Sequence, residues 1–83
     1  MNMQELCDAC RKRLRQLRES MGLSRPKFAD LLDIPPTTLK NYELGYREVG
    51  GGVLLLIANH PELSPHSLWL LTGQGEGSAK LEP

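Results

Sequence analysis

The chain has 83 residues, a mass of 9.3 kDa and no formal net charge, because ten Lys and Arg residues balance ten Asp and Glu residues. Its 40% hydrophobic content supports one small packed domain and excludes a disordered chain, and its longest apolar run, residues 53–58, is far shorter than the roughly 20 residues of a membrane span. With two cysteines and a polar start unlike a signal peptide, we expect a cytoplasmic protein with no membrane partner rather than a disulfide-rich secreted one.

The first part of the chain predicts two helices. Apolar residues recur every three or four positions from Leu6 to Met21, which draws one stripe on a helix that ends at Gly22. Ser24 is a favourable N-cap, and the apolar residues up to Leu32 predict a short second helix. A basic cluster on the outer face of the first helix is expected to be mainly solvated surface, with added phosphate binding as the alternative. The cluster comprises Arg11, Lys12, Arg13 and Arg15.

Three further helices are predicted after a proline break. Residues before proline avoid the helical backbone region, so the chain should be extended at Ile34 and Pro35, and a third helix should occupy residues 36–44. An apolar fourth helix over residues 53–59 follows a glycine-rich loop, and a fifth begins at Ser64 and ends at Gly73. No stretch alternates in the manner of a strand, so the predicted fold is all-α with five short helices. We expect residues 1–73 to form the domain and residues 74–83 a flexible C-terminal tail.

The two short helices around residues 33–35 are the feature with functional meaning. Helices joined by a turn of three or four residues can place the second one in the major groove of DNA, although generic helical hairpins share this pattern. Several further short motifs occur together, and their spacing along the chain is specific in combination: Leu17-Arg18, Met21-Gly22-Leu23-Ser24, Phe28-Ala29 with Leu32, Thr38-Leu39, Tyr42-Glu43 with Gly45, and Leu68 with Leu70-Leu71-Thr72-Gly73. With these motifs, residues 14–73 resemble the helix–turn–helix family of phage repressors and Cro proteins, often called the XRE family.

The resemblance implies a lambda-repressor-like DNA-binding domain of five helices, in which helices two and three form the helix–turn–helix. The chain departs from the family pattern at two positions of the turn: Asp33 replaces the usual glycine, and Pro35 replaces the usual Ser or Thr cap of the third helix. Asp tolerates left-handed backbone better than most residues, so the turn is expected to survive with some strain. The glycines at 50–52 replace a firmer loop and leave the position of the fourth helix less defined.

The resemblance also implies DNA contacts. The first exposed positions of the third helix are expected to meet base edges, and these are Pro36, Thr37, Lys40 and Asn41. Asn41 can pair with adenine and Lys40 with guanine, whereas outside this family both would be ordinary solvent-facing residues. Phosphate contacts are expected at the start of helix two, in helix three and in the loop that follows it, from Arg25, Lys27, Thr38, Tyr46 and Arg47.

Other residues are expected to have structural roles. In the family, the positions of Arg18 and Glu43 form a partly buried ion pair that joins helix one to the recognition helix. Tyr42 is expected to pack in the core with its hydroxyl at the rim. The apolar residues of the last two helices exceed what so small a core must bury, so a two-fold dimer interface is expected there, with core packing as an equal alternative for Trp69. The expected interface residues are Leu68, Trp69 and Leu71.

No enzyme activity, cofactor or metal is expected. Cys7 and Cys10 form a CxxC pair, but zinc needs two further ligands, and His60 and His66 are not in a standard spacing for a second pair. Cys10 lies on the apolar stripe and is therefore expected to be a buried free thiol, ahead of a zinc or redox role. The sequence also shows no nucleophile motif and no phosphate-binding glycine loop.

These features predict a sequence-specific regulator of transcription that binds double-stranded DNA, and in particular a homodimeric phage or prophage repressor on a near-palindromic operator. Such a protein would be associated with the nucleoid when bound and could be controlled by a protein antagonist. Zero net charge does not oppose this function, because residues 1–49 carry nine Lys or Arg residues and seven acidic ones. The alternative function is an antitoxin that binds a toxin partner through its apolar helices and DNA for autoregulation.

Overall fold

Residues 1–75, the part of the chain that the computed structural model describes, form five α-helices and one 3₁₀ helix, with no strand among them. The elements are α1 (Met3–Ser20), α2 (Arg25–Leu31), α3 (Pro36–Glu43), α4 (Gly51–Asn59), η1 (Ser64–His66) and α5 (Ser67–Thr72). The predicted all-α fold of five helices is confirmed. Most of the predicted tail, residues 76–83, lies outside the described residues.

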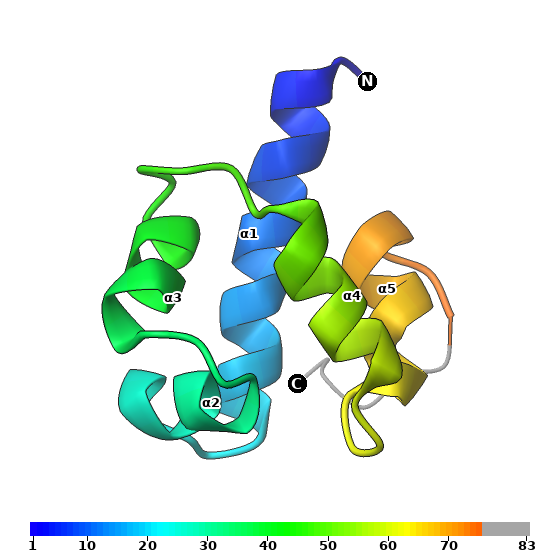
Figure 1. Cartoon of the computed structure of the whole chain (residues 1–83). Helices are drawn as coiled ribbons and strands as arrows, with labels where there is room; N and C mark the ends of the chain where they lie inside the picture. The colour runs from blue at the N-terminus through cyan, green and yellow to red at the C-terminus, as the bar shows by residue number, and fades with distance from the viewer. Residues whose placement is uncertain (76–83) are drawn as a thin grey trace.

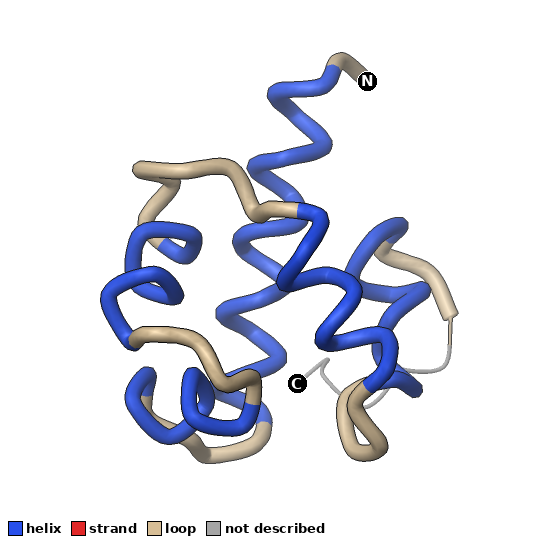
Figure 2. The backbone as a smooth tube through the Cα atoms, viewed as in Figure 1, coloured by secondary structure: helices blue, strands red, loops and turns tan. Residues whose placement is uncertain are grey.

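Helix α1 is the central element of the fold (Figure 1). Helices α2 and α3 pack on one side of it and α4 and α5 on the other, and the loops that join them can be followed in Figure 2. The core lies between these helices and is centred on Leu14 and Leu17 of α1, which are fully buried. The remaining core side chains are Cys10, Phe28, Ala29, Leu32, Leu39, Tyr42, Val53, Ile57, Leu63, Trp69 and Leu70.

Helix α1 begins two turns before it reaches the core. Asn2 caps its start, because the Asn2 side chain accepts a hydrogen bond of 2.9 Å from the Glu5 backbone N–H. The first turns extend past the other helices (Figure 1), and Leu6, the first member of the predicted apolar stripe, remains 49% exposed. The stripe is therefore buried only from Cys10 onward. No helix within residues 1–75 combines the length and the apolar character needed to cross a membrane.

The turn between α2 and α3 keeps its shape without the glycine typical of the family. Asp33 has a φ of 55°, in the left-handed region that the sequence led us to expect. Backbone hydrogen bonds of 3.1 Å from Asp33 to Asp30 and of 3.0 Å from Ile34 to Ala29 close the end of α2 around it. Pro35 stands at the N-cap of α3 with no side-chain capping bond. The start of α3 is therefore fixed by the backbone preferences of the prolines rather than by a cap.

The last two helices differ from the prediction at their starts. Helix α4 begins at Gly51, two residues before the predicted start, because Gly50 serves as the N-cap and the next two glycines enter the helix. The predicted fifth helix begins as the 3₁₀ turn η1 and becomes α-helical only at Ser67. Gly73, with a φ of 79°, ends α5 in the left-handed conformation that glycine adopts most easily.

Two members of the basic cluster on α1 hold the ends of other helices. Arg11 donates a hydrogen bond of 3.2 Å to the backbone carbonyl of Glu43 at the end of α3. Arg13 donates one of 3.3 Å to the carbonyl of Leu70 in α5. A positive charge near a helix C-terminus is favourable, because the last carbonyls lack partners within the helix. The expectation that this cluster is mainly solvated surface is therefore wrong for Arg11 and Arg13.

Candidate nucleic-acid interface

The orientation of α3 is fixed by an ion pair with α1. The Arg18 Nε and Nη2 atoms donate to the two carboxylate oxygens of Glu43 at 2.7 and 3.0 Å, and Nη1 donates to the Leu23 carbonyl at 2.8 Å. Arg18 is 8% exposed and Glu43 is 2% exposed. The hydrogen bonds with Glu43 raise the pKa of Arg18 above its ordinary value, although burial acts in the opposite direction. The structure therefore brings together the two residues that the family resemblance paired.

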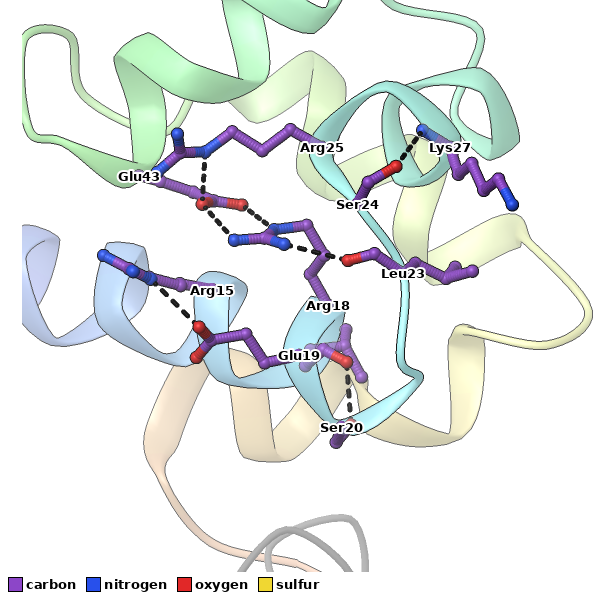
Figure 3. A network of polar contacts seen from close by, with 10 residues as sticks. Arg15, Arg18, Glu19, Ser20, Leu23, Ser24, Arg25, Lys27 and Glu43 are labelled. Atoms are coloured by element: carbon purple, nitrogen blue, oxygen red, sulfur yellow. Dashed lines mark hydrogen bonds and ion pairs between the residues drawn. The ribbon is translucent and has the colours of Figure 1, made fainter.

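Arg25 is the third member of this network (Figure 3). Its Nε atom donates to Glu43 Oε1 at 2.9 Å, so one buried carboxylate holds two guanidinium groups from different segments of the chain. The Arg25 side chain is 28% exposed, whereas that of Glu43 has no exposed area. Arg25 was expected to contact phosphate alone, and the structure gives it this second role. The network joins α1, the start of α2 and the end of α3.

The residues expected to meet base edges lie at the outer surface of α3, with one difference among them. Pro36, Thr37 and Lys40 are exposed, whereas Asn41 is half-buried. The Asn41 backbone carbonyl accepts hydrogen bonds from the backbone N–H groups of Tyr46 and Arg47, at 2.9 and 3.2 Å. These two bonds fold the loop after α3 back onto the end of the helix.

The other expected phosphate contacts surround this surface. Lys27 is exposed in the first turn of α2, where its backbone N–H donates to the Ser24 hydroxyl at 3.4 Å. Tyr46, which is 73% exposed, and Arg47 project from the loop that follows α3. Thr38 is half-buried on α3 itself. The expected phosphate contacts therefore lie in the first turn of α2, on α3 and in the loop after α3.

A groove runs beside the exposed start of α3. It has a volume of about 530 Å³ and is lined by residues of α1, of the loop before α2, of α2 and of α3. Four of the lining residues are cationic: Arg15, Arg18, Arg25 and Lys40. A concave surface lined by several positive side chains attracts anions, because their fields add within it.

The apolar residues of α5 divide between core and surface. Leu68 and Leu71 are 60% and 52% exposed, which leaves both free to contact a second molecule. Trp69 is 6% exposed and packs in the monomer core, so the alternative that placed it in a dimer interface is wrong. The face of α5 that carries Trp69 is turned toward the rest of the fold. Tyr42, expected in the core with its hydroxyl at the rim, is 9% exposed.

The cysteines lie on α1, and Cys7 lines a small cavity together with Gly45 and Arg47 of the loop after α3. Cys10 is buried and Cys7 is half-buried, and both are free thiols. Burial raises the pKa of the Cys10 thiol, an effect that the nearby Arg13 partly opposes and Cys7 adds to. Within residues 1–75, no three His, Cys, Asp or Glu side chains gather closely enough to hold a metal ion.

Comparison with known proteins agrees with this arrangement. A family model described as helix-turn-helix matches residues 14–68, more than half of the chain. The chain belongs to the helix–turn–helix family. This helix–turn–helix chain is similar to repressor protein C of Escherichia phage P2, with 36% identity over 58 residues that cover 70% of the chain and 59% of the relative. The chain therefore spans less than two thirds of the length of that relative. No solved structure matches the chain significantly. The resemblance to phage repressors is confirmed.

Sequence reasoning missed structural roles of three arginines of this helix–turn–helix domain. Arg15 was expected to be mainly solvated but lines the groove beside α3. Arg11 donates to the Glu43 carbonyl, and Arg25, expected at a phosphate, also shares the Glu43 carboxylate. One usable signal was present for α1, because positions 11, 15 and 18 step by four and three and so share one face of that helix.

Proposed function

We propose that this protein is a sequence-specific regulator of transcription that binds double-stranded DNA, and more narrowly a dimeric phage or prophage repressor of a near-palindromic operator. The observation that carries the proposal is the placement of α3, whose outer face at Pro36, Thr37 and Lys40 is exposed while its inner face is fixed to α1 by Arg18 and Glu43. Membership of the helix–turn–helix family and similarity to a phage repressor support the same function.

In this proposal α3 enters the major groove and its outer residues meet base edges. Lys40 donates to the O6 and N7 atoms of guanine, and Asn41 forms two hydrogen bonds with adenine. Thr37 offers a methyl group to thymine, and Pro36 makes apolar contact. Each good two-point contact distinguishes the correct base from a wrong one by about 1–3 kcal/mol. The fixed angle of α3 reduces the entropy that would be lost on ordering the helix at the DNA.

Phosphate contacts hold the domain in register on the duplex. Lys27 contacts the sugar–phosphate backbone from the first turn of α2, and Tyr46 with Arg47 contacts it from the loop after α3. Such contacts add affinity that depends on salt but carry no sequence information. The exposure of these three side chains supports this role.

Dimer formation is proposed to use the apolar residues exposed on α4 and α5. Leu55 and Leu56 of α4 and Leu68 and Leu71 of α5 are all at least 44% exposed, and the two helices lie side by side (Figure 1). A two-fold axis at this surface would place two α3 helices in successive major grooves, roughly 34 Å apart. A repressor bound to the operator would then keep RNA polymerase from the promoter. This regulation would take place in the cytoplasm. The same surface would also suit a toxin or antagonist protein, and co-purification of such a partner would favour the antitoxin function.

Two substitutions test the division between base and phosphate contacts. Lys40→Ala should reduce binding to a selected operator duplex by roughly 1–3 kcal/mol and relax the preference at one base position, while binding to scrambled DNA falls much less. Arg47→Ala should weaken both duplexes equally and lower the dependence of binding on salt. Equal losses on both duplexes for Lys40→Ala would contradict its role at the bases.

A further inference from the structure

The groove beside α3 has a charge arrangement that the expected contacts do not explain. Its cations come from three helices, with Arg15 and Arg18 from α1, Arg25 from α2 and Lys40 from α3. Two acidic side chains contact them: Glu43 holds Arg18 and Arg25, and Glu19 contacts Arg15 at 3.3 Å. With both acids counted, the groove keeps a net charge of +2, so its electrostatic preference is for an anion.

The two acidic partners differ in how firmly they hold their arginines. Glu43 is fully buried and orients Arg25 beside the groove through one bond of 2.9 Å to Nε. Glu19 and Arg15 are both about half exposed, and pairs of this kind contribute little to stability. Arg15 can therefore exchange Glu19 for a phosphate oxygen at little cost, whereas Arg25 is already positioned (Figure 3).

We infer that this groove binds a phosphate of the DNA backbone, with Arg15, singled out from the basic cluster of α1, as a phosphate ligand and Glu43 as the positioning residue for Arg25. The inference rests on the proposed DNA binding. Arg15 is on α1, ten residues before the start of α2, yet it faces the same concave surface as Thr37 and Lys40. The contact would fix the DNA strand next to the turn of α3 that meets the bases.

Salt-dependent binding measures the contact directly. Each phosphate contact adds about 0.9 to the slope of log affinity against log salt, so between 50 and 200 mM salt it accounts for about a 3.5-fold loss of affinity. Fluorescence anisotropy with a labelled duplex, selected from a random pool by the wild-type protein, gives this slope for each variant. Between 50 and 200 mM salt, the affinity of Arg15→Gln for the duplex should therefore fall about 3.5-fold less than that of the wild-type protein.

The matched control is Lys12→Gln, which removes the same charge from the same helix at an exposed position outside the groove. It should leave the slope close to that of wild type. Glu19→Gln frees Arg15 and should increase affinity at low salt. All three positions are exposed, so circular dichroism is expected to show the wild-type fold.

The outcomes separate this inference from the function on which it rests. Equal slopes for Arg15→Gln and Lys12→Gln, with strong binding by wild type, would overturn the role of Arg15 and leave DNA binding intact. A wild-type protein that binds no duplex from the pool would overturn both. A lower slope for Arg15→Gln alone would establish the contact.

Discussion

Loss of Arg18 should destabilise the fold far more than loss of Arg25, although both side chains contact the same carboxylate. Arg18 makes two bonds to Glu43 and one to the Leu23 carbonyl, and it is 8% exposed. Breaking a buried pair of this kind costs about 3–5 kcal/mol, because the buried Glu43 carboxylate keeps its desolvation penalty and retains only the partly exposed Arg25 as a partner. Arg25 makes one bond and is more than a quarter exposed, so its removal should cost about 1 kcal/mol.

Urea unfolding of Arg18→Met and Arg25→Met measures this difference. Trp69 is the single tryptophan of the chain and is buried, so its fluorescence reports on the core. Arg18→Met should also lower Tm by more than about 10 °C, since a domain of this size loses about 4–8 °C per kcal/mol. The double variant Arg18→Met with Glu43→Leu should recover most of the loss, because it leaves no unpaired buried charge.

The result that would refute this reasoning is equally definite. Similar losses for Arg18→Met and Arg25→Met would show that burial does not set the strength of the pair. A double variant no more stable than Arg18→Met would show that the loss does not arise from a buried carboxylate left with Arg25 alone.

Four further predictions concern the backbone and the thiols. Asp33→Gly should raise the free energy of unfolding by about 0.5–1 kcal/mol in urea titrations, because glycine adopts a φ of 55° without strain, and a decrease would contradict this account. Gly73→Ala should lower it by about 1–2 kcal/mol, since its φ is 79° and an added Cβ would lie 2.6 Å from the Arg13 side chain; an unchanged thermal melt would show that the site relaxes freely. Because burial raises the pKa of Cys10, iodoacetamide should alkylate Cys7 first in the folded protein, and equal rates by mass spectrometry would argue against burial. Because the pKa of Cys10 is higher in the folded protein, the unfolded chain loses the Cys10 proton at a lower pH than the folded one. Unfolding therefore becomes more favourable at high pH, so the stability of Cys7→Ala should fall as the pH rises above 9.0, and a flat profile would contradict this.

Much of the fold could be predicted because local signals agreed with one another. The apolar stripe of α1, the Ser24 cap and the proline at the start of α3 each specify one helix without help from distant residues. The starts of α4 and η1 were less predictable. Gly51 and Gly52 are poor helix formers, so their helix propensity did not predict that α4 includes them.

The candidate site was predictable in type but not in its polar network. Exposure of Lys40 on α3 follows from the helical period and from the family resemblance. The use of Arg11 as a helix-end partner and the sharing of Glu43 by two arginines depend on how α1 crosses α3, which the sequence alone does not specify. Trp69 shows the same limit, because the apolar period of α5 does not reveal which of its faces the core takes up.

The claim at the centre of this account is that α3 enters a major groove at a fixed angle and reads bases. Selection from a pool of random duplexes, followed by sequencing of the bound fraction, tests it most directly. We expect a dyad-symmetric consensus whose half-sites are centred about 10 base pairs apart, with one position in each half relaxed by Lys40→Ala. A bound fraction with no consensus, or a consensus unchanged by Lys40→Ala and Asn41→Ala, would contradict base recognition by α3.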